Sequence, residues 1–195
     1  MKKARIRAIG VSSILFFLLL FQSSPADSTH DSHITHVVHP AKLLLYSDAQ
    51  AVCDDSALIV RVRKINEEPL SYDLGEGHVD RFTLSRVEIL DVYAQAEGFA
   101  CSKGDNISIL ESEWYNEAER TINHTEAYTK MQEGKIYRLY LGYNREVDNF
   151  YPIGLLYGKV PEDSGEAVYY GANIDAQIDG VIRALRDYPH EPLGR

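Results

Sequence analysis

Apolar and polar side chains alternate along several stretches of the chain, which is the pattern of β-strands with one buried face. Leu58, Val60 and Val62, for example, are each followed by a residue that faces the other way. Gly, Asn, Asp and Pro residues bound these stretches and supply turns. The pattern predicts five strands, which are centred on Leu58–Val62, Phe82–Tyr93, Ile107–Ile109, Tyr137–Tyr143 and Tyr151–Val160.

The second of these stretches changes phase. Phe82 and Leu84 alternate, and then Val87 and Ile89 continue on the opposite parity. An extra residue in a strand produces such a shift and bends the strand around a barrel. We therefore predict a β-bulge near Ser85-Arg86.

The segment Tyr115–Gln132 between the third and fourth strands is too long for a hairpin turn. It contains neither Gly nor Pro, so we expect a helical connection there. Three strands, a helix and two strands is the order of an OB-fold. The predicted fold is mainly β, a five-stranded OB-like barrel over residues 53–165.

The last segment, residues 166–195, has the spacing of an amphipathic helix. Asp175 and Asp179 lie near its start and Arg183 and Arg186 near its end, which suits the helix dipole. Five apolar side chains share one face, and we expect them to pack on the barrel: Ile174, Ile178, Val181, Ile182 and Leu185.

The chain begins with a basic stretch, an apolar run from Ile9 to Phe21, and then Ser24-Pro25-Ala26. This order is typical of a secretory signal, and we place the cleavage after Ala26. The apolar run is short for a membrane span, so we expect no stable membrane insertion after cleavage, although an uncleaved anchor is the alternative. Residues 27–52 then form a His-containing lead-in, either a loose arm or a first strand.

Removal of the signal makes the protein strongly acidic. The signal holds four of the 20 Lys and Arg residues and none of the 29 Asp and Glu residues, which leaves a formal charge of −13. Such a surface repels phosphate backbones. Nucleic acid is therefore excluded as a partner.

Two cysteines occur, Cys53 just before the first predicted strand and Cys101 just after the second. An antiparallel pairing of those strands brings both to one end, and export permits oxidation. We expect a Cys53–Cys101 disulfide, with two free thiols as the alternative.

Four histidines recur at every third position of the lead-in: His30, His33, His36 and His39. Neutral imidazole binds Zn and Cu, so the run is a candidate for weak binding of either metal. Metal sites usually draw ligands from separate parts of a rigid frame. A polar arm without metal is therefore the favoured interpretation, and we expect no other cofactor.

Four carboxylates surround Trp114 and Tyr115, and a pair of them is a candidate for glycosidase-like hydrolysis. Nothing in their spacing fixes a catalytic distance, so we expect an open, solvated acidic face whose Glu to Gln variants fold normally. The four are Glu111, Glu113, Glu117 and Glu119. The sequence contains no nucleophile elbow, His-Glu-x-x-His, phosphate-binding glycine loop or Cys-x-x-Cys.

Four segments together resemble secreted bacterial proteins of the netrin/tissue-inhibitor-of-metalloproteinases-like OB-fold class: residues 55–62, 82–90, 103–107 and 133–141. The resemblance covers about Cys53 to Val160 and implies a barrel used for binding. In the animal inhibitors an amino-terminal Cys chelates the protease zinc and many disulfides hold that end. Here Cys53 is internal and only two cysteines exist, so no inhibitory residue carries over.

Together these observations predict a secreted or cell-envelope binding module without enzymatic activity, acting on a protein or envelope ligand. Two alternatives remain. One is a hydrolase that uses the acidic cluster around Trp114. The other is an exported metal-binding protein that uses the histidine run.

Overall fold

The computed structural model describes residues 33–171 and 174–193. The predicted signal, residues 1–26, and His30 lie outside the described residues. The fold is mainly β, as predicted, with helices at two places. In chain order the elements are β1 (Thr35–His39), α1 (Ala49–Asp55), β2 (Leu58–Gly75), β3 (His78–Gln95), β4 (Asn106–Glu111), β5 (Glu113–Asn116), β6 (Thr121–Thr125), β7 (Ile136–Asn144), β8 (Asn149–Pro152), β9 (Lys159–Pro161) and α2 (Ala176–Asp187).

Five strands pair in a closed ring, in the order β2-β3-β4-β8-β7 and back to β2. All contacts in the ring are antiparallel except that between β4 and β8, which is parallel and consists of the single pair Ile109 and Phe150. β9 extends the sheet beyond β7. The ring is therefore thinnest between β4 and β8.

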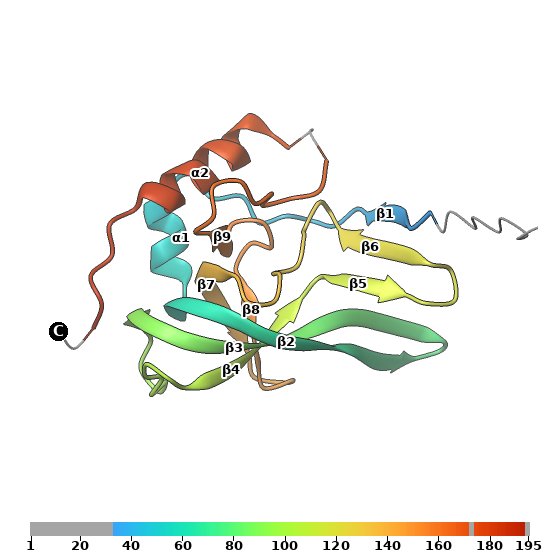
Figure 1. Cartoon of the computed structure of the whole chain (residues 1–195), viewed down its shortest axis with the longest axis horizontal. Coiled ribbons are helices and arrows are strands. Elements are labelled where there is room, and N and C mark those ends of the chain that lie inside the picture. Colours follow the sequence, from blue (N-terminus) through green and yellow to red (C-terminus); the bar gives the residue numbers. More distant parts are fainter. Residues whose placement is uncertain (1–32, 172–173, 194–195) are drawn as a thin grey trace, which may run out of the picture. The chain divides into compact units, whose positions relative to one another are not determined.

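A second, three-stranded sheet has the order β1-β6-β5 and lies beside the ring (Figure 1). β5 and β6 form an antiparallel hairpin, and β1 pairs in parallel with β6. The prediction of a helical connection in Tyr115–Gln132 was therefore wrong. The residues of β6 that are buried are Thr121, Asn123 and His124, so its inward positions are polar and the apolar alternation of a strand is missing.

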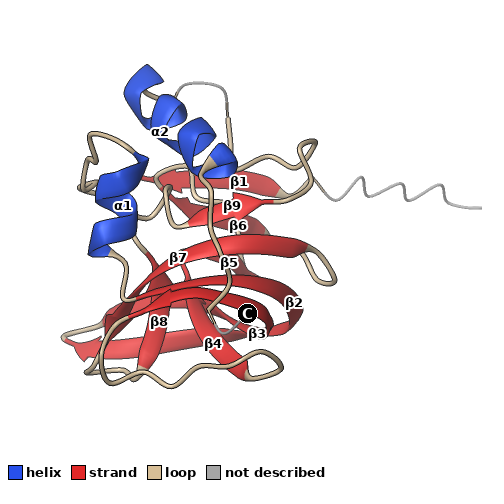
Figure 2. Ribbon diagram, turned by 90° about the vertical axis from the view of Figure 1, so that its left-hand side faces the viewer, coloured by secondary structure: helices blue, strands red, loops and turns tan. Residues whose placement is uncertain are grey.

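The interior of the ring holds one apolar core, formed mainly by β2, β3 and β7. A second core lies between the outside of the ring and the two helices, which pack next to each other (Figure 2). The predicted C-terminal helix is confirmed as α2, and its buried face consists of Ile178, Val181, Ile182 and Leu185. The sequence did not reveal α1, which begins with Asp48 accepting a hydrogen bond from the backbone N–H of Ala51.

The bulge predicted at Ser85-Arg86 does not occur in β3, where Thr83, Ser85 and Val87 are buried in unbroken alternation. The change of phase in the sequence reflects polar residues at inward positions. The register does shift nearby, but the extra residue is Ile65 of β2. Neither described helix is long and apolar enough to cross a membrane.

Candidate functional site

The hairpin formed by β2 and β3 extends far beyond the ring (Figure 1). β2 pairs with β7 only through Leu58–Arg63, and β3 pairs with β4 only through Thr83–Glu88. Past these points, among the strands that the structure describes, β2 and β3 pair with each other alone. The distal half of the hairpin is thus a projecting two-stranded arm.

The base of the arm is a branch point. β4 follows β3 as far as Glu111, and after Ser112 the chain continues as β5, which pairs with β6 instead. The hydroxyl of Thr83 donates to the carbonyl oxygen of Glu113 at 2.6 Å and links β3 to the first residue of β5. Beyond it, the edge of β3 over His78–Phe82 is no longer covered by the strand that covers Thr83–Glu88.

A pocket of about 600 Å³ lies in this divergence. We call it the β3–β5 groove, and its lining residues are Pro69, Leu70, Ser71, Arg81, Phe82, Trp114, Tyr115, Asn116, Glu117 and Ala118. Its aromatic residues come from both sides of the branch. Tyr115 is 47% exposed, whereas Trp114 is packed from behind by the His39 ring of β1, at 5.2 Å between centroids.

A buried polar cluster closes the end of the ring next to the branch point. At its centre is Glu111, which is fully buried and accepts hydrogen bonds from four donors. The Tyr128 hydroxyl and the Met131 backbone N–H each lie 2.7 Å from Oε2. The Ser85 hydroxyl contacts Oε1, and Lys64 Nζ lies 3.4 Å from the same oxygen. These bonds fasten the loop after β6 to the ring.

Lys159 is a second buried cation in this region. Its ammonium group donates to the carbonyl and hydroxyl oxygens of Thr129 and lies over the ring of Tyr128, 5.1 Å from the centroid. Burial lowers the pKa of Lys159 to about 8, and the nearby carboxylates of Glu111 and Glu166 oppose that effect. A lysine with such a pKa is chemically nucleophilic when it is neutral, but this one is fully buried.

No protein-family model, curated protein or solved structure matches this chain.

The acidic residues around Trp114 do not form the open face that the sequence suggested. Glu111 and Glu113 are buried, and only Glu117 and Glu119, in the turn between β5 and β6, are exposed. Both oxygens of Glu111 are already engaged by donors, and Oε2 of Glu113 lies 3.2 Å from the backbone nitrogen of Lys130. The four carboxylates are therefore divided between the interior and the surface.

The three histidines of the run that lie within the described residues do not converge on one point. His33 precedes β1 and is exposed, and His36 and His39 lie three residues apart on β1, a spacing that puts them on opposite faces of a strand. His36 contacts His124, whereas His39 contacts the side chain of Asn123. Within residues 33–171 and 174–193, no group of three or more His, Cys, Asp or Glu residues is arranged to hold a metal ion.

The predicted disulfide is absent, and both cysteines are free. Cys53 lies in α1 and packs against the core beneath the helices, whereas Cys101 lies in the loop after β3 and packs against the core of the ring. The prediction failed because α1 turns the chain before β2 begins. Burial raises the pKa of both thiols.

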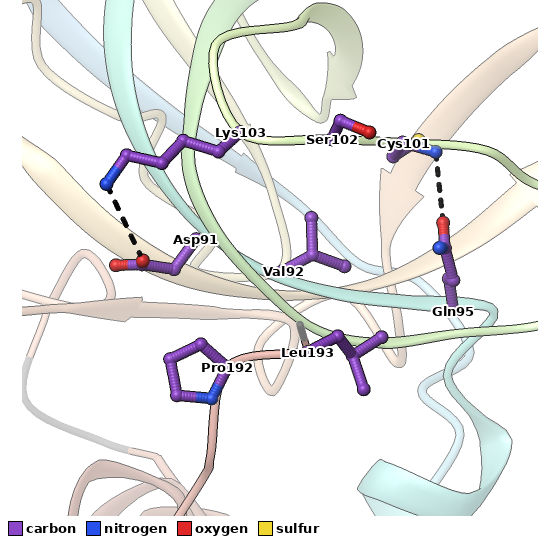
Figure 3. Close-up of a pocket in the computed structure, with 8 residues that line it drawn as sticks. All are labelled: Asp91, Val92, Gln95, Cys101, Ser102, Lys103, Pro192 and Leu193. Atoms are coloured by element: carbon purple, nitrogen blue, oxygen red, sulfur yellow. Dashed lines mark hydrogen bonds and ion pairs between the residues drawn. The ribbon is translucent and has the colours of Figure 1, made fainter. Parts of the chain in front are cut away.

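A pocket of about 500 Å³ lies beside Cys101 and is lined in part by Pro192 and Leu193 of the C-terminal segment (Figure 3). Pro192 and Leu193 form one wall of this pocket, and the N–H of Leu193 donates to the carbonyl oxygen of Val92 at 2.8 Å. Lys103 and Asp91 face each other across the other side at 4.0 Å. The β3–β5 groove adds an uncovered strand edge and three aromatic side chains, and it is the better candidate for a ligand.

Proposed function

We propose that the protein is a secreted or cell-envelope binding module without enzymatic activity, built on an OB-like barrel. The closed order of five strands supports this fold, because a five-stranded, partly open barrel is the architecture of an OB-fold. The weak closure between β4 and β8 fits a barrel that is only partly closed. Export rests on the N-terminal sequence, and sequencing of the mature protein should find its first residue at or near Asp27.

The observation that carries the proposal is the branch point, where β4 stops pairing with β3 and the chain continues as β5 away from it. It places an uncovered edge of β3 beside an aromatic pocket at the surface. An extended peptide can add to such an edge through backbone hydrogen bonds while pockets select its side chains. We therefore propose that the ligand is an extended segment of a protein partner, bound in the β3–β5 groove.

The chemistry of the groove favours a polypeptide over other ligands. A row of backbone N–H and C=O groups is matched in spacing by another backbone. Phe82, Trp114 and Tyr115 supply apolar surface, and the groove has one basic and one acidic side chain, Arg81 and Glu117. A polyanionic ligand is disfavoured, because the groove offers it one cation, Arg81, on a mature protein of formal charge −13.

The test uses peptides selected from a random dodecapeptide display library on the purified protein. Tyr115→Ser should weaken binding of these peptides about tenfold or more, the effect of losing an exposed aromatic contact of about 1.4 kcal/mol. Leu45→Ser is the matched control, because Leu45 is also a large exposed apolar residue, at 61%, and lies outside the groove. NMR amide shifts on binding should concentrate in His78–Phe82 and Trp114–Asn116.

Two results would overturn the proposal. One is that no peptide is selected, or that the selected peptides bind the Tyr115→Ser protein as well as the wild type. The other is turnover of glycan, peptide or ester substrates that falls about a hundredfold in a single Glu to Gln variant, as expected for loss of a general acid or base.

A further inference from the structure

The strand β1 is fastened to β6 by a pair of imidazoles. His36 Nδ1 and His124 Nε2 lie 2.8 Å apart, and the two rings are within 9° of parallel with centroids 5.2 Å apart. The facing nitrogen atoms therefore lie nearly on the line between the two rings, which meet edge to edge. Tyr170 covers this contact, because its ring is 4.5 Å from both imidazoles and parallel to both.

The partners of His124 determine where the protons lie. His124 is buried, and its Nδ1 faces two acceptors, the carbonyl oxygen of Tyr128 at 2.9 Å and Oε2 of Glu113 at 3.1 Å. Nδ1 must therefore carry a hydrogen. In a neutral His124, Nε2 is then an acceptor, and His36 Nδ1 donates to it.

Starting from two neutral imidazoles, the docked pair can bind one additional proton and keep its hydrogen bond. A proton on the outer nitrogen of His36 leaves the hydrogen bond to His124 unchanged. A proton on His124 reverses that bond, and His36 can then accept through Nδ1. A second proton leaves two N–H groups facing each other at hydrogen-bond distance, which removes the bond and adds repulsion between two cations.

We infer that this imidazole pair is a pH-sensitive latch that releases β1 in mildly acidic conditions. Once β1 is released, the two imidazoles no longer face each other, and each can carry a proton of its own. The released state can therefore bind two additional protons, whereas the docked state can bind one. Imidazole takes up protons in the mildly acidic range. By linkage, acidification through that range weakens docking of β1 by up to tenfold per pH unit.

The other charged groups around the pair come from every neighbouring element. Glu113 of β5 contacts Nδ1 of His124, and the adjacent pocket also contains Glu67 of β2 and Lys130 and Glu133 of the loop before β7. Glu67 is paired with Lys64 and Lys130, and these contacts lower its pKa although burial opposes them. His39 of β1 contacts Asn123 Oδ1, an acceptor that holds either protonation state of the imidazole.

Release of β1 has two structural consequences. It uncovers the edge of β6 over Thr121–Thr125, and it withdraws His39 from the back of Trp114. Release of β1 on acidification does not require a ligand in the β3–β5 groove.

Hydrogen exchange of the purified protein tests the latch between pH 7.5 and 4.5, after correction for the intrinsic rate. Protection of residues 35–39 should fall about a hundredfold between pH 6.5 and 4.5, while residues 58–63 and 136–141 of the ring stay protected. His36→Gln should abolish this pH dependence and keep docking at pH 7.5, because an amide can donate to or accept from His124 without titrating.

His39→Gln is the matched control. It removes a titratable residue from the same strand outside the pair, and its pH dependence should match that of the wild type. Two results would overturn the latch: equal loss of protection in β1 and the ring on acidification, or a His36→Gln protein that loses β1 protection as steeply as the wild type.

Discussion

Glu111→Gln should be far more destabilising than Lys64→Met, although the two residues form one buried ion pair. Glu111 is held by three hydrogen bonds besides its contact with Lys64, from the hydroxyls of Ser85 and Tyr128 and the N–H of Met131. An amide at position 111 turns an NH₂ group toward donors and leaves Lys64 without its buried anion. Removal of one partner from a buried pair typically costs about 3–5 kcal/mol, which we expect here.

Lys64→Met leaves a better-satisfied interior. The carboxylate of Glu111 keeps its three shorter hydrogen bonds, and Lys159 remains as a second buried cation whose pKa responds to it. Glu67 keeps its contact with Lys130. The losses are the contact of Lys64 Nζ with Glu67 and its bond to the carbonyl oxygen of Met131 at 2.6 Å, so we expect a cost of about 1–2 kcal/mol.

Urea unfolding, followed by the fluorescence of the single tryptophan, measures both values. The double variant should be no less stable than Glu111→Gln alone, because it removes a buried lysine whose remaining ionic partner is the half-buried Glu67. A Lys64→Met protein as unstable as Glu111→Gln would refute the reasoning, since it would make the ion pair, and not the hydrogen bonds, the main interaction of Glu111.

Two further predictions concern buried titratable groups. The pKa of Lys159 in the folded protein is about 8, below its ordinary value, so above pH 8 the unfolded state binds more protons than the folded state. The stability of the wild type relative to Lys159→Met should therefore rise by about 1–2 kcal/mol between pH 7.5 and 9.5. Urea midpoints of both proteins at the two pH values measure this, and an unchanged difference would contradict it. Mass spectrometry after alkylation of the unreduced protein should find two labelled cysteines, and slow labelling of the folded state is expected from their raised pKa; an unlabelled, oxidised pair would contradict the structure.

The sequence predicted the elements whose buried side is apolar. β2, β4, β7 and α2 lie where the alternation or helical spacing placed them, because Leu58, Ile109, Leu139 and Ile182 fill cores. The sequence pattern does not predict elements whose buried side is polar. It favours a helix where β6 lies, and it favours a bulge in β3 where Ser85 faces inward.

The candidate site was predicted only in part. The sequence indicates Trp114 and its neighbouring carboxylates as candidates, but the alternation of apolar and polar residues does not show that Glu111 faces inward while Tyr115 faces outward. The β3–β5 groove depends on where β4 stops pairing with β3, which is a long-range register and not a local pattern. The histidine spacing was visible, but the partner of His36 is 88 residues away.

The two edges of the projecting arm differ in their ability to pair with a strand of another molecule. β2 carries Pro69, which lacks an N–H, together with the charged residues Glu68 and Asp73. Proline and charge on an exposed edge prevent unwanted strand pairing. The β3 edge over His78–Phe82 also carries charge, at Asp80 and Arg81, but it has no proline, so none of its residues lacks a backbone N–H. At high protein concentration, the arms of neighbouring molecules should therefore pair through the β3 edge and not through the β2 edge.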